Sequence, residues 1–214
     1  MSLTLIVGNR NYSSWSLRPW LAMKQVGLAF DEVRVRLNQP DSKSQILRYS
    51  PSGRVPCLVD GALAVWDSMA ICEYVNEQYA GGGLWPRDVG QRARARSIAA
   101  EMHSGFAALR THMPMDIRGH FPERGAAAAA RPDVSADIAR IQSIWTDCLA
   151  SGGPFLFGAF SIADAFYAPV VTRFRTYAVA LPARLAAYSD AVFALPAMQE
   201  WVAAAAAEPE TLDD

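Results

Sequence analysis

Strand-forming patterns are confined to the first third of this 214-residue chain, and the later segments have the spacing of helices. Residues 3–7 form a short apolar run, and residues 33–37 alternate apolar and charged side chains, which is typical of a half-buried strand. Residues 57–59 and 63–66 flank Asp60-Gly61, a strong hairpin signal. Strands followed by helices favour two packed modules over one interleaved sheet.

Helical patterns separate and follow these strands. Apolar residues recur at helical spacing around residues 17–21, and Pro19 is expected in the first turn of that helix. A second apolar stripe covers residues 71–79, and Pro51-Ser52-Gly53 indicates a loop before the hairpin. The first module is therefore predicted as β-α-β, a loop, then β-β-α.

The composition changes after Ala80-Gly81-Gly82-Gly83, where alanine becomes frequent. We predict one long helix with the buried face Ile98, Met102, Phe106, Leu109 and Met113. Further helices are expected over 138–149 and 162–177, at the alanine-rich stretch 126–130, and after Pro182 and Pro196. The predicted domains are residues 1–81 and residues 88–214.

Charge and cysteine usage exclude several classes of function. The net charge of -1 favours neither nucleic acid nor an anionic membrane, and no apolar run reaches the roughly 20 residues that span a bilayer. The N-terminus lacks a secretory pattern. Three widely spaced cysteines and three histidines predict no metal site and suit a reducing compartment. We expect a cytoplasmic protein with no metal, nucleic acid or membrane partner.

Hydroxyl residues cluster between the first strand and the first helix, in Asn11-Tyr12-Ser13-Ser14-Trp15-Ser16-Leu17-Arg18. Such residues commonly cap a helix by accepting hydrogen bonds from its first N–H groups. The same helix N-terminus favours an anion, and a thiolate that accepts a hydrogen bond from a serine there has a lowered pKa. The segment fits either a cap or a thiolate site.

Two further segments carry a similar ambiguity. Val55-Pro56 leads into the hairpin as a plain turn, but a cis peptide bond here leaves the backbone of Val55 free to pair with a bound peptide. Asp67 is an ordinary N-cap candidate. Alternatively, Ser68 and the helix N–H groups hold a carboxylate while Asp67 lies near an ammonium group, which suits a zwitterion.

In this order and spacing, the three segments resemble the glutathione site of the cytosolic glutathione transferases. The resemblance covers nearly the whole chain, because Ser161-Ile162-Ala163-Asp164 matches the N-capping box of a core helix in that family. It implies an α/β thioredoxin-like N-terminal domain followed by an all-α helical domain. It also implies glutathione as co-substrate, a homodimer and no need for a metal.

The resemblance assigns candidate catalytic residues at the start of the first helix. Ser13-Ser14-Trp15-Ser16-Leu17-Arg18 is similar to the zeta-class pattern Ser-Ser-Cys-x-x-Arg. By that match Ser13 is the leading candidate for stabilising the thiolate, and Ser14 contributes a hydroxyl or an N–H. Tyr12 is the alternative, because other classes use a tyrosine.

The remaining glutathione-binding candidates are Arg54, Val55, Asp67 and Ser68. The resemblance implies that Val55 pairs through its backbone with the cysteinyl unit, while Asp67 and Ser68 hold the γ-glutamyl end. Cys57, which follows this turn, is expected to be a buried strand residue and not a redox centre.

The second substrate is implied to lie between the domains, in a pocket that includes Tyr12, Trp15, Phe106, Arg110, Met113 and Arg173. The apolar residues of this set could equally be ordinary core residues, and the two arginines could form surface ion pairs. The histidines His103, His112 and His120 fit solvated or capping roles. An arginine that faces the cleft favours an anionic substrate. Trp15 departs from the zeta pattern, which has cysteine at that position, and so supplies no second thiol.

We therefore expect a glutathione transferase that binds glutathione as a thiolate and conjugates or transfers it to a small electrophile, in detoxification. One alternative is a glutathione-dependent cis-trans isomerase similar to maleylacetoacetate isomerase, which the departure at Trp15 disfavours. The other is a non-catalytic glutathione transferase-like binding module, which the presence of all three segments disfavours.

Overall fold

The N-terminal third forms a four-stranded mixed sheet. The computed structural model describes residues 3–211. The ends of the two predicted domains, residues 1–2 and 212–214, lie outside the described residues, as does the start of the chain to which the prediction on a secretory pattern applies. The elements are β1 (Leu3–Val7), α1 (Ser14–Gln25), β2 (Asp31–Arg34), α2 (Ser42–Leu47), β3 (Cys57–Asp60), β4 (Leu63–Trp66) and α3 (Ser68–Gln78). The strand order is β2-β1-β3-β4, with only β1 and β2 parallel. This arrangement confirms the predicted thioredoxin-like fold.

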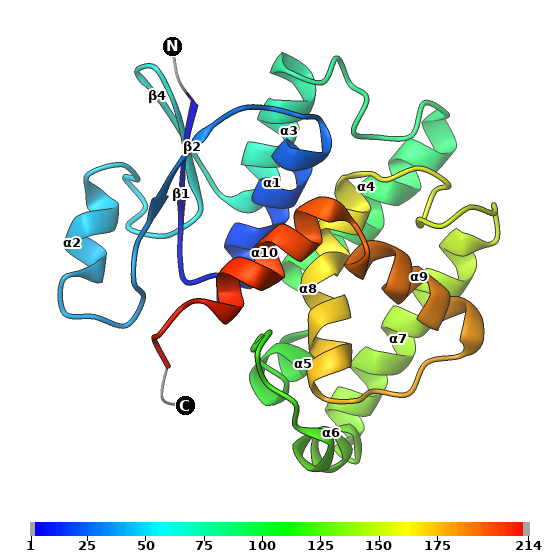
Figure 1. Cartoon of the computed structure of the whole chain (residues 1–214). Helices are drawn as coiled ribbons and strands as arrows, with labels where there is room; N and C mark the ends of the chain where they lie inside the picture. The colour runs from blue at the N-terminus through cyan, green and yellow to red at the C-terminus, as the bar shows by residue number, and fades with distance from the viewer. Residues whose placement is uncertain (1–2, 212–214) are drawn as a thin grey trace.

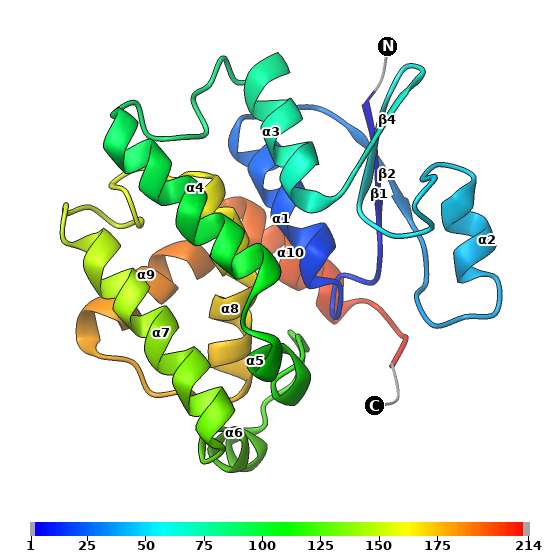
Figure 2. The ribbon, with the colours of Figure 1, turned by 180° about the vertical axis from the view of Figure 1, so that it is seen from behind.

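The two faces of the sheet carry different helices (Figures 1 and 2). Successive side chains of a strand point to opposite faces. Leu5 accordingly joins the large core with α1 and α3, whereas Ile6 joins Val35, Ile46 and Cys57 in a small cluster under α2. The sheet is therefore covered on both sides.

Three local predictions for this part need correction. β2 covers Asp31–Arg34 and not residues 33–37. The predicted loop before the hairpin contains the six-residue helix α2. Pro19 lies in the second turn of α1 because the helix begins at Ser14, and it leaves the carbonyl of Trp15 without its usual helical hydrogen bond.

The rest of the chain is helical, as predicted. The elements are α4 (Val89–Ser104), α5 (Ala107–His112), α6 (Pro122–Ala129), α7 (Pro132–Leu149), α8 (Ile162–Thr176), α9 (Ala183–Phe193) and α10 (Pro196–Ala206). Among residues 3–211, no helix combines the length and apolar character needed to cross a membrane.

The single long helix predicted through residues 98–113 is wrong. The chain breaks between α4 and α5, where Phe106 has a left-handed φ of 56°. At Gly105, a Cβ atom would lie 2.7 Å from the carbonyl oxygen of Glu101. Met102 and Met113 are buried on either side of the break. The apolar spacing therefore predicted which residues are buried, but not that the helix is interrupted between them.

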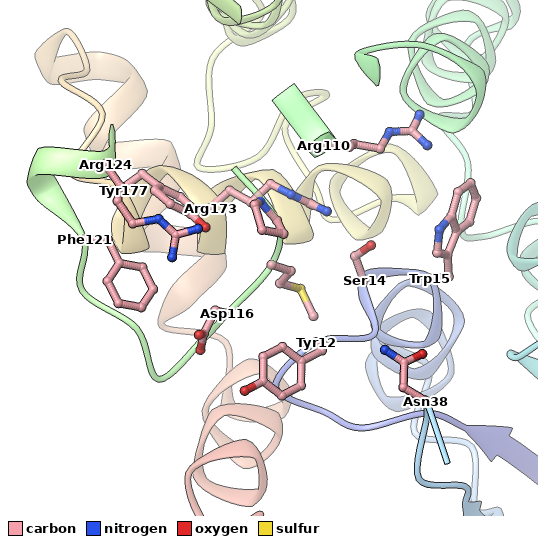
Figure 3. Close-up of a pocket in the computed structure, with 12 residues that line it drawn as sticks. Tyr12, Ser14, Trp15, Asn38, Arg110, Asp116, Phe121, Arg124, Arg173 and Tyr177 are labelled. Carbon is pink, nitrogen blue, oxygen red and sulfur yellow. The ribbon is translucent and has the colours of Figure 1, made fainter. Parts of the chain in front are cut away.

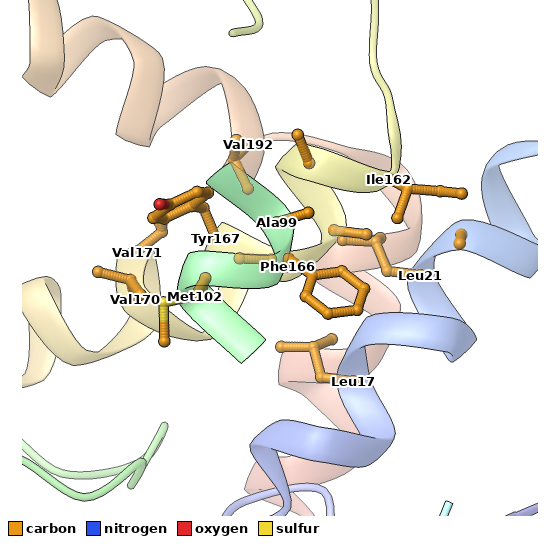
Figure 4. Packing of buried hydrophobic residues seen from close by; sticks show 14 of the residues in the cluster. Leu17, Leu21, Ala99, Met102, Ile162, Phe166, Tyr167, Val170, Val171 and Val192 are labelled. Carbon is orange, nitrogen blue, oxygen red and sulfur yellow. The ribbon is translucent and has the colours of Figure 1, made fainter. Parts of the chain in front are cut away.

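One hydrophobic core continues from the sheet domain into the helical domain. Figure 4 shows Leu17 and Leu21 of α1 beside Ile162 and Phe166 of α8, with Met102 of α4 close by. Because α1 packs on α8, the start of α1 is held at the junction of the two domains.

The predicted capping box at the start of α8 is confirmed. The Asp164 carboxylate accepts hydrogen bonds from the Ser161 N–H at 2.8 Å and from the Leu156 N–H at 3.0 Å. The side chain is fully buried, and burial raises the pKa of Asp164 to about 6.

Candidate functional site

The three predicted segments line one cavity of about 580 Å³ at the edge of the sheet domain. The lining residues are Trp15 from α1, Ser52, Arg54, Val55 and Pro56 from the turn before β3, and Trp66, Asp67 and Ser68 from the junction of β4 and α3. All four glutathione-binding candidates from the last two segments are therefore brought together.

The start of α3 offers groups for an anion beside an acid. Asp67 caps the helix through a 2.8 Å hydrogen bond from the Met69 N–H to Oδ1, and its φ is 74°. Ser68 is fully buried, and its hydroxyl has no hydrogen-bond partner among the described residues. A helix N-terminus with an unpartnered hydroxyl suits a carboxylate, and the adjacent Asp67 suits an ammonium group.

The turn before β3 lines the same cavity. The Val55-Pro56 peptide bond is cis, and Val55 precedes the strand ladder, which begins at Cys57. Cys57 itself is a buried strand residue, as predicted, and burial raises the pKa of its thiol.

The two candidate serines, Ser13 and Ser14, have different surroundings. Ser13 is the N-cap of α1 and accepts a hydrogen bond from the Ser16 N–H at 3.4 Å. The Ser13 hydroxyl also donates to Ser16 Oγ at 2.8 Å, and Ser16 Oγ in turn accepts from the Gly8 N–H at 3.0 Å. Ser13 is therefore engaged in an internal network at the start of the helix.

Ser14 instead lines a second cavity, and its hydroxyl does not take part in the hydrogen bonds that join Ser13, Ser16 and Gly8. As the first residue of α1 it lies where the helix N-terminus favours negative charge. The geometry thus favours Ser14 over Ser13 for contact with a ligand, the reverse of the order expected from the sequence.

The second cavity, of about 590 Å³, lies between the two domains (Figure 3). Of the predicted pocket residues, Tyr12, Trp15, Arg110 and Arg173 line it, whereas Phe106 and Met113 are buried and do not. Lining residues that the sequence analysis did not single out are Asn38, Pro114, Met115, Asp116, Phe121, Arg124 and Tyr177. Trp15 lines both cavities and forms the wall between them.

Arg173 is not the surface ion-pair residue suggested as one interpretation of the sequence. Only 4% of it is exposed, and its guanidinium donates to the backbone carbonyls of Met113 at 2.9 Å and Pro169 at 3.1 Å. Burial and the nearby Arg110 lower the pKa of Arg173 to about 10. Within residues 3–211 it forms no ion pair with a carboxylate, and Figure 3 shows its guanidinium directed into the cavity.

Arg110 and Arg18 add positive charge around Trp15. The Arg110 guanidinium donates to the carbonyls of Met102 at 2.9 Å and His103 at 3.1 Å, and burial lowers its pKa. Arg18 is 1% exposed, with its guanidinium carbon 4.2 Å from the Trp15 ring centroid; burial lowers its pKa to about 9. Burying a charge without an ion pair is costly, so Arg110 and Arg173, which line the second cavity, favour an anionic ligand there.

His103, which the sequence analysis did not place at the site, is half-buried in the last turn of α4. From α4 it reaches the sheet domain, with Nε2 3.3 Å from Asp67 Oδ2 and its ring 5.1 Å from that of Trp15. Burial lowers the pKa of His103, although Asp67 opposes the shift. No sequence motif distinguishes this histidine from His112 and His120.

Tyr12 lines the second cavity together with Ser14, but its hydroxyl does not face the Ser14 side chain. Its hydroxyl accepts a 3.2 Å hydrogen bond from Arg118, and Figure 3 shows it directed away from Ser14.

Among residues 3–211, no group of three or more His, Cys, Asp or Glu side chains is arranged to bind a metal.

A thioredoxin-like domain and an all-helical domain with two adjoining cavities define the glutathione transferase fold. Family models for the "Glutathione S-transferase, N-terminal domain" and the "Glutathione S-transferase, C-terminal domain" match residues 12–78 and 91–204. The chain therefore belongs to the glutathione S-transferase family.

The similarity to individual relatives is partial. Over 65 residues the chain is 42% identical to a dichloromethane dehalogenase of Methylorubrum extorquens, which covers 29% of this chain and 23% of that protein. Over 100 residues it is 33% identical to a probable maleylacetoacetate isomerase of Caenorhabditis elegans, covering 47% and 46%. The chain thus spans less than half the length of these curated relatives.

A solved structure is similar over the full length. A bacterial zeta-class glutathione S-transferase, described as a maleyl pyruvate isomerase, is 26% identical, with a TM-score of 0.72. The match covers 98% of this chain and 100% of that one.

Proposed function

We propose that this chain is a glutathione transferase that binds glutathione as a thiolate and transfers it to a small electrophile. The observation that carries the proposal is the convergence of three separate segments on one cavity, which Trp15 separates from the second. Family membership and the transferase and isomerase relatives support it.

In this proposal each segment binds one part of the tripeptide. The backbone of Val55 pairs with the cysteinyl unit, and Arg54 lies at the rim of the cavity. Asp67 binds the γ-glutamyl ammonium group, while Ser68 and the N-terminus of α3 bind its carboxylate. The sulfur then extends past Trp15 toward the start of α1.

The start of α1 stabilises the thiolate. The Ser14 hydroxyl donates to the sulfur, the helix N-terminus adds its positive end, and Ser13 holds the turn as N-cap. Lowering the thiol pKa by two units corresponds to about 2.7 kcal/mol in favour of the thiolate. The sulfur attacks an electrophilic carbon of the second substrate, and the leaving group or the adjacent double bond takes up the electron pair.

The buried Arg173 and the neighbouring Arg110 favour a second substrate that carries a carboxylate. The same observation favours the alternative function, glutathione-dependent isomerisation of an unsaturated acid. Isomerisation regenerates glutathione in each cycle, whereas conjugation consumes it. We also propose a cytoplasmic homodimer with a role in detoxification, which the resemblance to the family supports.

Calorimetric titration with glutathione tests the proposal against the non-catalytic binding module. We expect saturable binding that weakens at least tenfold in Asp67→Asn, because the ammonium group loses its counter-charge. Turnover of paired electrophiles, with and without a carboxylate, is followed together with free thiol. A folded protein that neither binds glutathione nor consumes an electrophile would contradict the proposal.

A further inference from the structure

The loop that carries the serines is anchored by the C-terminal end of the chain. This serine loop (residues 9–14) runs from β1 into α1, and Figures 1 and 2 both show the C-terminal segment beside it. One carboxylate oxygen of Glu208 accepts the Arg10 N–H at 2.8 Å, and the other accepts the Asn11 N–H at 3.2 Å. Glu208 is 6% exposed, so the two bonds are shielded from water.

Asn11 provides a second anchor, to the segment between α5 and α6. It is fully buried, its Nδ2 donates to Asp116 Oδ1 at 2.8 Å, and its Oδ1 accepts the Arg118 N–H at 2.9 Å. Its backbone carbonyl accepts the Ile117 N–H at 3.3 Å. The loop is thus held on both sides by the helical domain.

Arg118 joins the two anchors to the second cavity. Its guanidinium donates to the backbone carbonyls of Glu208 and Glu210, the latter at 2.7 Å, and to the Tyr12 hydroxyl at 3.2 Å. The Trp201 indole N–H of α10 also donates to the carbonyl of Arg10, at 2.9 Å. The C-terminal segment therefore contacts the loop on which both serines and Tyr12 lie.

We infer that Glu208 is a positioning residue for the thiolate-stabilising hydroxyl of Ser14, an inference that rests on the proposed function. Glu208 fixes two consecutive N–H groups three and four residues ahead of Ser14, and the loop continues from them directly into α1. A displacement of about 1 Å at a reacting group can cost about 100-fold in rate. Loosening this anchor is expected to weaken the bond from Ser14 to sulfur without removing any contact to glutathione.

The charge of Glu208 and its positioning role predict opposite changes in the pKa of the bound thiol, so the two can be told apart by experiment. A nearby carboxylate alone would raise the pKa of the bound thiol, so neutralising it would lower that pKa. Arg34, with Nη1 3.2 Å from Glu208 Oε1, already offsets much of this charge. Loss of positioning raises the thiol pKa instead.

The experiment compares Glu208→Ala and Glu208→Gln with Glu210→Ala as the matched control. Glu210 lies in the same segment and pairs with Arg34 at 3.0 Å, but its carboxylate makes no contact with the serine loop in the described structure. The pKa of enzyme-bound glutathione is measured by ultraviolet thiolate absorbance, together with kcat and the glutathione Kd.

We expect Glu208→Ala to raise the bound thiol pKa by about one unit and to lower kcat about tenfold at neutral pH, with Kd changed less than threefold. Glu208→Gln, which keeps one acceptor oxygen, shifts the pKa in the same direction by less, and decides the matter if the alanine variant does not fold. Glu210→Ala leaves both quantities at wild-type values.

An unchanged or lowered thiol pKa in folded Glu208→Gln would overturn the inference, as would an equal shift in Glu210→Ala. A wild-type protein with no thiolate signal would refute the proposed function and the inference with it.

Discussion

Replacing Ser14 by alanine removes the hydroxyl that we place against the glutathione sulfur. A hydrogen bond to a charged acceptor contributes about 1.5–3 kcal/mol. At 1.36 kcal/mol per pKa unit, its loss raises the pKa of the bound thiol by about one to two units. Below both pKa values, the thiolate fraction and turnover with a generic aryl electrophile therefore fall about 10- to 100-fold. Glutathione binding changes little, because Val55, Asp67 and Ser68 are untouched.

Ser13→Ala and Tyr12→Phe are the matched controls for this prediction. Ser13→Ala removes the N-cap of α1 and costs about 1 kcal/mol of stability, seen as a lower Tm, with a smaller change in the thiolate titration. Tyr12→Phe loses only the contact with Arg118. A pKa shift confined to Ser13→Ala or to Tyr12→Phe, with Ser14→Ala unchanged, would refute the assignment of Ser14.

Three further predictions concern the cavity wall, the core and the domain junction. Arg173→Gln raises KM at least tenfold for a carboxylate electrophile but not for a neutral analogue; equal losses for both would show that the charge is not used. Asp164→Ala leaves the N–H groups of Leu156 and Ser161 unpaired and lowers the free energy of unfolding by about 2–6 kcal/mol in denaturant titrations. Because burial raises the pKa of Asp164 to about 6, its proton contributes stability below the ordinary carboxyl pKa that is lost as the pH rises through about 6, and Asp164→Asn removes this dependence. His103→Phe keeps the ring packing but loses the contact with Asp67, so the glutathione KM rises about 2- to 10-fold with kcat unchanged.

The helices and strands could be predicted from the sequence because the spacing of apolar residues and the residues that form turns and caps are local properties. The hairpin around Asp60-Gly61 and the capping box at Ser161 are short-range signals, and both occur in the structure. The break at Phe106 could not be predicted, because burial on both sides of it preserves helical spacing. Likewise, the short helix α2 lacks a long periodic stripe.

The same distinction between local and tertiary features applies to the candidate site. Arg54, Val55, Asp67 and Ser68 lie in contiguous motifs and line one cavity, whereas neither Ser13 nor Ser14 lines it. The orientation of Ser14 relative to Ser13 depends on which of them caps α1, and the motif alone does not contain this information. Arg173 is buried among other segments of the helical domain, and His103 meets Asp67 only when α4 packs against the sheet domain, so their burial and contacts are tertiary properties.

A crystal structure of the protein with glutathione tests the central claim most directly. We predict the sulfur within hydrogen-bond distance of Ser14 Oγ, the cysteinyl backbone paired with that of Val55, and the γ-glutamyl group between Asp67 and Ser68. A tripeptide bound away from these segments, or bound among them with its sulfur directed away from the start of α1, would contradict the account.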